Sequence, residues 1–244
     1  RTHPLTTKRI ADMENRIQPR PYRQVSDSLE YLLVRAKLKA GEGTPQDGLA
    51  DFESQLREHK FSSEIATRYG LAIAHLRVGN FSAAQQQMME LRRLKANSAM
   101  IESLDAELLK RQNDLAGALN ILRPALARFP QERGLAYALV ETLLDDSQPQ
   151  AALRATLEDL QVYPTDAHMQ GLQARIYAVM GKRLQQHRAQ AEVYILQGQL
   201  LEAISQLQMA QKASDGDFYE HSQVDARLRE IKLRQAEEVK EKRR

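Results

Sequence analysis

The stretch "SAMIESLDAELLKRQNDLAGALNILRPALARFPQ", residues 98–131, contains two apolar helical patterns joined by the polar turn "RQND" and closed by Pro130. In the first pattern Ala106 and Leu109 lie three residues apart, on one helical face. Ala118 in the second pattern offers a small side chain against which a neighbouring helix can pack closely. Because proline disrupts a helix that continues through it, the second helix is predicted to end before Pro130. The stretch therefore predicts a helical hairpin.

The same hairpin pattern recurs along the chain with a period of 34 residues. Three columns show it: Ala50, Ala84, Ala118 and Ala152; then Ala72, Ala106, Val140 and Ala174; then His75, Leu109, Leu143 and Tyr177. Pro130 and Pro164 close two successive units. The physical interpretation is a stack of hairpins, in which small residues let helices approach and a larger residue fills the space beside them.

This pattern resembles the tetratricopeptide repeat. In residues 98–131 the signature positions hold Ala106, Leu109, Ala118, Leu122, Ala125 and Pro130. Residues 64–98 and 133–166 are similar, although the large aromatic residue of the signature's first helix is missing from all three units. The resemblance covers about residues 28 to 215 and implies an all-α fold, a right-handed α-solenoid of degenerate tetratricopeptide repeats.

The period is broken once. Ala203 follows Ala152 by 51 residues, which is one period and a half. We therefore expect an extra half-repeat helix between about residues 183 and 196, shared by the unit before it and the unit after it. Val224, Leu228 and Ile231 form one apolar stripe in an otherwise charged terminal segment, which predicts a C-terminal capping helix.

These patterns divide the chain into four parts. They are 1–17, the end of a preceding domain; 18–27, a proline-containing linker; 28–216, the repeat solenoid; and 217–244, the capping helix.

The first part supplies a second resemblance. "HPLTTKRI", residues 3–10, resembles the H-P-x-x-x-x-R-I segment that ends the catalytic domain of zinc metalloproteases with an H-E-x-x-H helix. In one subset, the periplasmic β-barrel assembly-enhancing proteases, tetratricopeptide repeats follow directly. The resemblance implies a periplasmic zinc metalloendopeptidase as the parent, with its zinc-binding domain upstream. It also implies that His3 is a candidate zinc contact in the intact parent only, a solvent-facing histidine in a turn being the alternative.

Composition excludes several other classes. Only 5% of the residues are aromatic and tryptophan is absent, which favours helices over strands. A net charge of +3 from 35 basic and 32 acidic residues, with both signs mixed, does not indicate nucleic-acid binding. No apolar run approaches the roughly 18 residues of a membrane span. The H-E-x-x-H, G-x-S-x-G and phosphate-loop motifs are absent, so this chain is predicted to be non-catalytic and without a cofactor of its own.

The remaining candidate site is the groove lined by the first helix of each hairpin. The repeat places Tyr69 and Tyr137 at one groove-facing position, two units apart, and Glu107, Glu141 and Arg175 on the same side. Tyrosine combines apolar area with a hydroxyl that needs a partner, which is typical of binding surfaces. We predict that these five residues contact a protein or peptide partner. Packing of the tyrosines inside the stack is the alternative.

Two other polar groups have structural interpretations. His75 occupies a position that packs between helices, and we expect a hydrogen-bonded core histidine rather than a ligand. Asp217, His221 and Asp225 are four residues apart, but zinc sites usually need three or four convergent ligands, and no second histidine lies nearby. We interpret them as a polar helix start.

Two hypotheses on function follow. In the first, the chain is the partner-binding repeat region of a metalloprotease, holding outer-membrane proteins or their assembly machinery for quality control and contacting the parent's own protease domain. In the second, it is a non-enzymatic tetratricopeptide scaffold or adaptor, and the likeness of residues 3–10 is accidental. An H-E-x-x-H sequence upstream of Arg1 would distinguish them.

Overall fold

A computed structural model describes residues 6–16 and 26–242, and over these residues it contains thirteen α-helices and no strand. The helices are α1 (Thr6–Arg16), α2 (Leu29–Gly41), α3 (Pro45–Arg57), α4 (Glu64–Arg77), α5 (Phe81–Arg93), α6 (Ala99–Arg111), α7 (Leu115–Arg128), α8 (Arg133–Asp145), α9 (Pro149–Val162), α10 (Ala167–Val179), α11 (Arg183–Leu196), α12 (Leu200–Gln211) and α13 (Phe218–Lys242). None of these helices is both long enough and apolar enough to span a bilayer.

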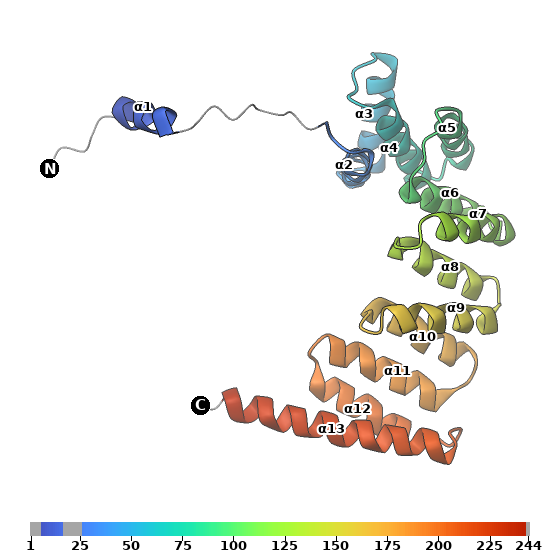
Figure 1. Cartoon of the computed structure of the whole chain (residues 1–244). Helices are drawn as coiled ribbons and strands as arrows, with labels where there is room; N and C mark the ends of the chain where they lie inside the picture. The colour runs from blue at the N-terminus through green and yellow to red at the C-terminus, as the bar shows by residue number, and fades with distance from the viewer. Residues whose placement is uncertain (1–5, 17–25, 243–244) are drawn as a thin grey trace.

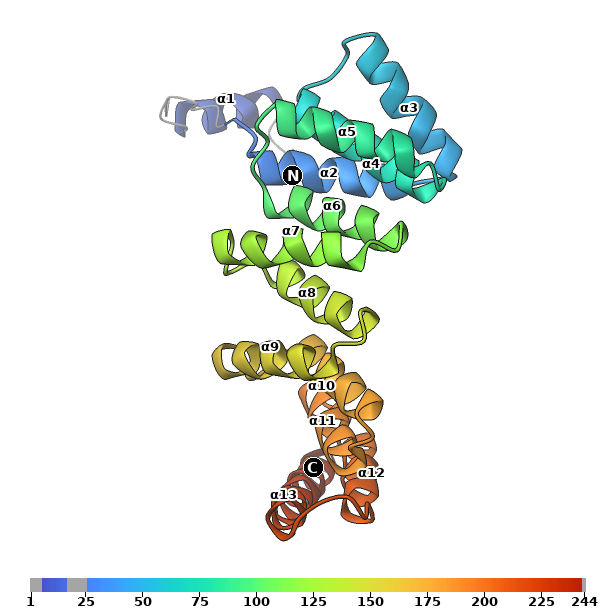
Figure 2. The ribbon, with the colours of Figure 1, turned by 90° about the vertical axis from the view of Figure 1, so that its right-hand side faces the viewer.

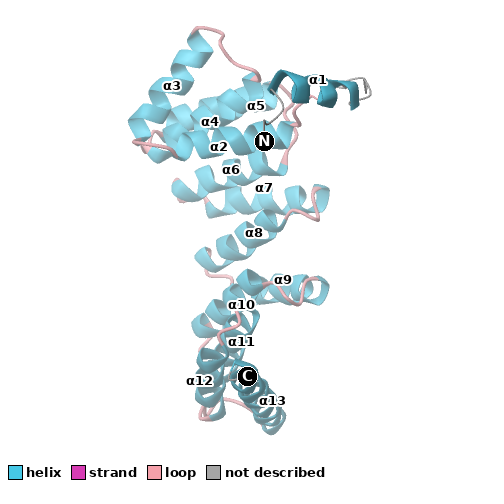
Figure 3. Ribbon diagram, turned by 90° about the vertical axis from the view of Figure 1, so that its left-hand side faces the viewer, coloured by secondary structure: helices cyan, strands magenta, loops and turns pink. Residues whose placement is uncertain are grey.

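From α2 onward the helices stack one on another in chain order (Figures 1, 2 and 3), and Figure 1 shows α1 away from the stack. The buried apolar residues form three clusters that follow one another along this stack. A solenoid buries its core between neighbouring repeats rather than around one centre, so several clusters in a row are expected. The predicted helical-repeat solenoid is confirmed.

The turns that follow α4, α6, α8 and α10 show the 34-residue period directly. Four turn residues have a positive φ, namely Gly79 (76°), Asn113 (62°), Ser147 (54°) and Gly181 (72°). The next residue's N–H donates to the carbonyl oxygen of the third repeat column, in Asn80 to His75, Asp114 to Leu109, Gln148 to Leu143 and Lys182 to Tyr177, at 2.8–2.9 Å. This left-handed closure is a common way to end a helix. These four first helices therefore end in the same way, which fixes the direction of the helix that follows each of them.

The extra half-repeat helix is also confirmed. α11 packs against both α10 and α12, so it completes one hairpin and begins the next. Its first turn is capped by a residue that is remote in sequence. The Asp215 carboxylate accepts hydrogen bonds from the N–H groups of Arg183 (2.5 Å) and Leu184 (3.2 Å). Asp215 lies in the loop between α12 and α13, and this contact ties that loop to the start of α11.

The last helix covers the open end of the stack. Val224, Leu228 and Ile231 are buried against residues of α11 and α12, including Leu184 and Leu207. The opposite face of α13 is charged, as the predicted capping role requires. Asp217 and Glu220 exchange hydrogen bonds between side chain and backbone, at 3.0 and 2.8 Å, so the interpretation of this segment as a polar helix start is confirmed.

The prediction for His75 was half right. Its side chain is buried, with 7% exposed, but its Nδ1 atom has no hydrogen-bond partner among the described residues. Burial lowers the pKa of His75, although the nearby Glu53 acts in the opposite direction. The histidine is therefore an incompletely satisfied polar group in the core.

We expect His75→Leu to stabilise the chain by about 1 kcal/mol at pH 7, since it removes a buried polar atom that makes no hydrogen bond. The gain should increase below pH 6.5. A histidine whose folded pKa is depressed contributes its full stability above its unfolded pKa and loses it as pH falls. Urea unfolding of both proteins between pH 5 and pH 8 measures this difference. A gain that does not change with pH would contradict the assignment.

Candidate functional site

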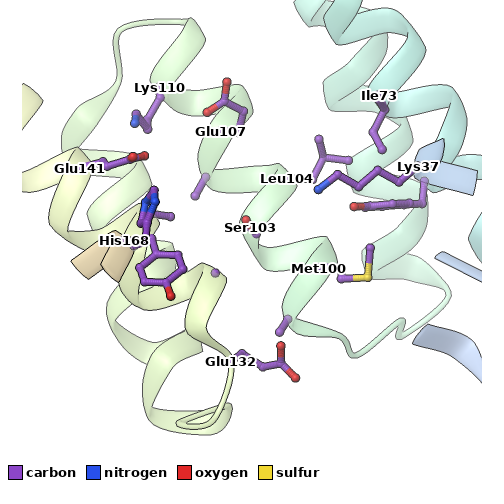
Figure 4. Close-up of a pocket in the computed structure, with 16 residues that line it drawn as sticks. Lys37, Ile73, Met100, Ser103, Leu104, Glu107, Lys110, Glu132, Glu141 and His168 are labelled. Carbon is purple, nitrogen blue, oxygen red and sulfur yellow. The ribbon is translucent and has the colours of Figure 1, made fainter. Parts of the chain in front are cut away.

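A cavity of about 470 Å³ opens on the side of the stack formed by the first helices of the hairpins. It is lined by α2, α4, α6, α8 and the first turn of α10, and Figure 4 shows the side chains that surround it. Ile73, Met100 and Leu104 lie on one side of it, close to Lys37, and Glu107, Lys110, Glu141 and His168 lie on the other (Figure 4). Glu132 lies apart from these four polar residues.

The repeat period explains which residues reach this cavity. Tyr69, Ser103 and Tyr137 are 34 residues apart and all line it, and so are Ile73, Glu107 and Glu141. Since each unit enters the stack in the same orientation, one helical face is presented repeatedly to the same side. The sequence therefore predicted four of the residues that line the cavity, Tyr69, Glu107, Tyr137 and Glu141.

The predicted groove exposure of Tyr69 is wrong. Only 3% of Tyr69 is exposed, and it belongs to the N-terminal core cluster together with Leu33 and Leu104. Burial raises its pKa to about 12. The alternative interpretation therefore holds for this tyrosine, because α4 lies between α2, α3 and α5 and is covered on several sides. Tyr69 forms part of the cavity wall from within the core.

Tyr137 is half-buried, and its partners come from within the chain. Its hydroxyl donates to Asp166 Oδ2 at 2.5 Å, and its ring lies 4.4 Å from the ring of His168, centroid to centroid. The guanidinium carbon of Arg133 lies 5.2 Å from the Tyr137 ring centroid. Burial, followed by the bond to Asp166, raises the pKa of the Tyr137 hydroxyl. Tyr137 thus holds the cavity wall in place.

Asp166 is the centre of this network. It caps α10 by accepting the Met169 N–H at 2.9 Å, and it also accepts from Tyr137 and from the Nε of Arg133 at 3.1 Å. Arg133 also pairs with Asp159 of α9, at 2.6 Å. Burial by itself would raise the pKa of Asp166, but the hydrogen bonds outweigh it and lower the pKa. The network joins α8, α9 and α10 at the edge of the cavity.

The charges in the cavity are unevenly neutralised. Glu107 pairs with Arg111 at 2.7 Å, and Lys110 pairs with Asp145 at 3.1 Å. Within the described part of the chain, neither Glu132 nor Glu141 has an ion pair or a side-chain hydrogen bond. The cavity wall therefore offers two free carboxylates to an incoming group.

The other predicted site residues lie elsewhere. Arg175 is exposed on α10 and is not part of the cavity wall, and His3 lies outside the described residues. Over residues 6–16 and 26–242, no three histidine, aspartate or glutamate side chains converge in a way that could hold a metal ion. The described residues thus do not form a zinc site.

Sequence reasoning missed Lys37, Arg133, Asp166 and His168. The register could have indicated His168, which follows Gly134 by one period. Arg133 and Asp166 lie 33 residues apart, outside the columns, and their pairing depends on how α8 meets the start of α10. No signal in the sequence showed it.

Repeated hairpins closed by the same left-handed turn, a half-repeat helix and a cavity along the first helices define the class of protein: the chain is a tetratricopeptide-repeat solenoid. It resembles the repeat-containing region of the β-barrel assembly-enhancing protease. The protease of Yersinia pestis is 25% identical over 232 residues, covering 95% of this chain and 48% of the relative. The protease of Escherichia coli K12 is 26% identical over 234 residues, covering 95% of this chain and 47% of the relative.

The chain thus spans about half the length of the curated relatives it matches. No protein-family model matches it.

Solved structures agree on the fold. A double mutant of MamA RS-1 superimposes with a TM-score of 0.53 at 15% identity, covering 72% of this chain and 97% of the other. YrrB, described as a tetratricopeptide-repeat protein with an unusual peptide-binding site, superimposes with a TM-score of 0.51 at 15% identity, covering 82% of this chain and 95% of the other. A tetratricopeptide-repeat protein from Parabacteroides merdae superimposes with a TM-score of 0.52 at 14% identity, covering 92% of this chain and 89% of the other.

Proposed function

We propose that this chain is the partner-binding repeat region of a zinc metalloprotease that acts in outer-membrane protein assembly and quality control. The observation that carries the proposal is the cavity of about 470 Å³, which places an apolar wall beside two free carboxylates on the inner face of a helical-repeat stack. Inner faces of such stacks commonly hold extended or helical peptide segments. The cavity has room for a few side chains of such a segment.

The parent is supported by the relatives, which match this chain over 95% of its length. In the proposed parent, a domain preceding the repeats binds zinc and cleaves the polypeptide, and the repeats hold that polypeptide close by. A periplasmic location and the role of His3 near the metal belong to the same proposal. The residues described here contribute binding and orientation.

We expect Ser103→Trp to weaken the capture of an unfolded outer-membrane β-barrel protein by at least about tenfold, since the indole would fill the middle of the cavity. The barrel protein, unfolded in urea and carrying a fluorescent label, is diluted into solutions of the chain, and binding is followed by fluorescence anisotropy. The matched control is Ser205→Trp, the same substitution at an exposed position on α12.

The outcomes separate the two hypotheses on function. Preference for the barrel protein over an unfolded soluble protein of equal length supports the proposed role. Equal capture of both, lost in Ser103→Trp, would instead favour a general scaffold or adaptor. Capture that Ser103→Trp leaves unchanged would remove the cavity from binding altogether.

A further inference from the structure

A cavity of about 380 Å³ lies on the other side of α8 from the cavity described above. Ala136 and Leu139 of α8 line it, whereas Tyr137 and Glu141 line the first cavity. On a helix with 3.6 residues per turn, these two pairs point roughly 150° apart. The rest of its wall comes mainly from α7, from α9 and from the segments that follow these two helices, so it is named here the α7–α9 cavity.

The repeat period shows why the α7–α9 cavity exists. One period earlier, two ion pairs join α6 to the helices on either side of it: Arg92 of α5 with Asp105, and Arg128 of α7 with Glu102 at 2.5 Å. The four positions 34 residues later are all apolar, and in the same order they hold Leu126, Leu139, Val162 and Ala136. The bridges that join the earlier helices therefore have no counterpart around α8.

A fifth position widens the space. Ile121 of α7 is followed one period later by Ala155 of α9, which lines the cavity with a much smaller side chain. The apolar wall is also open to solvent, since Val162 is 68% exposed and Leu126 and Ala155 are partly exposed. A hollow lined by several apolar side chains that water can reach gains free energy when an apolar group fills it.

Two polar contacts at the edge of the cavity are completed within the chain. The Asp159 carboxylate is paired with Arg133 at 2.6 Å, and the Tyr163 hydroxyl donates to the Gln131 Oε1 atom at 2.7 Å. The guanidinium carbon of Arg133 also lies 4.1 Å from the centroid of the Tyr163 ring. These groups fix the shape of the rim rather than await a ligand.

Glu158 is different. It is exposed, and within the described part of the chain it has no ion pair or side-chain hydrogen bond, not even with Arg154 one turn earlier on α9. Among residues 6–16 and 26–242, no basic residue lines the cavity. Glu158 and Val162 are four residues apart and so share one face of α9. A group seated against Val162 therefore meets an unpaired carboxylate, which favours a cation.

We infer that the α7–α9 cavity is a second binding site, which takes a polypeptide segment with an apolar side chain close to a basic one. The apolar side chain fills the space beside Leu126, Ala155 and Val162, and the basic side chain pairs with Glu158 at the mouth. The site shares no lining residue with the first cavity. It therefore adds to the proposed function and does not depend on it.

Three pentapeptides test the inference by NMR titration of the whole chain. The probe is acetyl-Ser-Phe-Ser-Lys-Ser-amide, in which phenylalanine and lysine lie on the same side of an extended chain. In the second peptide glutamate replaces the lysine, and in the third serine replaces the phenylalanine. We expect the probe to shift the methyl signals of Leu126, Ala155 and Val162, and to bind at least about threefold more tightly than either of the other peptides.

A reversal of charge gives the sharpest variant. In Glu158→Lys the glutamate peptide should bind more tightly than the probe, because the attraction and the repulsion exchange places. Glu237→Lys, the same change at an exposed position on α13, is the matched control and should leave both affinities within about twofold. Circular dichroism checks that both variants keep the native helix content.

Ser103→Trp, which fills the first cavity, should leave binding of the probe within about twofold. Loss of binding in this variant would place the peptide in the first cavity and overturn the second site. Unshifted signals at Leu126 and Val162, a probe that binds no better without its phenylalanine being lost, or a preference that Glu158→Lys does not change would overturn it as well. Binding of a partner in the first cavity is measured separately, so either site can fail alone.

Discussion

Gly70→Ala is expected to lower the free energy of unfolding by about 2 to 3 kcal/mol. Gly70 lies in the middle of α4, where alanine would ordinarily favour the helix by about 1 kcal/mol. A Cβ atom at this position would stand 2.4 and 2.5 Å from two ring carbons of Phe52, which is 2% exposed. The ring cannot yield, because it is closed in between α3 and α4, so the helices would have to separate.

Gly171→Ala provides the matched control in the middle of α10. Its Cβ would meet only a methyl group of Val193, at 3.9 Å, an ordinary contact. We expect this substitution to stabilise the chain by roughly 0.5 to 1 kcal/mol. Urea unfolding followed by circular dichroism measures both variants. If Gly70→Ala also stabilised the chain, the close packing of Phe52 on α4 would be refuted.

Asp166→Ala is the second large effect, with an expected loss of about 3 kcal/mol. The substitution removes the cap of α10 and at the same time leaves Arg133 and the Tyr137 hydroxyl without one of their partners. Only 11% of the Asp166 side chain and 25% of the Arg133 side chain are exposed, so water does not readily replace the lost bonds. We expect the variant to loosen the joint between α8 and α10 as well.

Asp114→Ala isolates the capping contribution. Asp114 caps α7 through the Gly117 N–H at 2.8 Å, and no ion pair to it occurs in the described part of the chain. Its loss should cost about 1 kcal/mol. Equal losses in the two variants would show that the Arg133 network adds nothing to stability.

The pH dependence gives an independent check on Asp166. Its folded pKa is lowered, so its contribution is fully present above the usual carboxyl value of 3.8 and is lost as pH falls through the folded pKa. The difference in stability between the native chain and Asp166→Ala should therefore be constant above about pH 5 and shrink below pH 4. Thermal unfolding at stepwise lower pH measures it.

The sequence by itself determined the repeat architecture, because the restraints that specify it are local and periodic. The position of Ala106 is taken by Ala72, Val140 and Ala174 at spacings of 34 residues. The units that begin with α4, α6, α8 and α10 repeat the same helix, left-handed turn and helix. The spacing between Ala152 and Ala203 was enough to place α11. The same register predicted that Glu107, Tyr137 and Glu141 share one face, since a helical period fixes direction.

Only the tertiary structure decided how that face is used. The period assigns Tyr69 and Tyr137 the same direction, yet α4 is enclosed by its neighbours and Tyr69 is buried, while Tyr137 is held by Asp166. The packing of Phe52 against Gly70 and the pairing of Arg133 with Asp166 both depend on contacts between different helices. A periodic pattern specifies which way a side chain points. What it meets there depends on the packing of neighbouring helices, which no local pattern encodes.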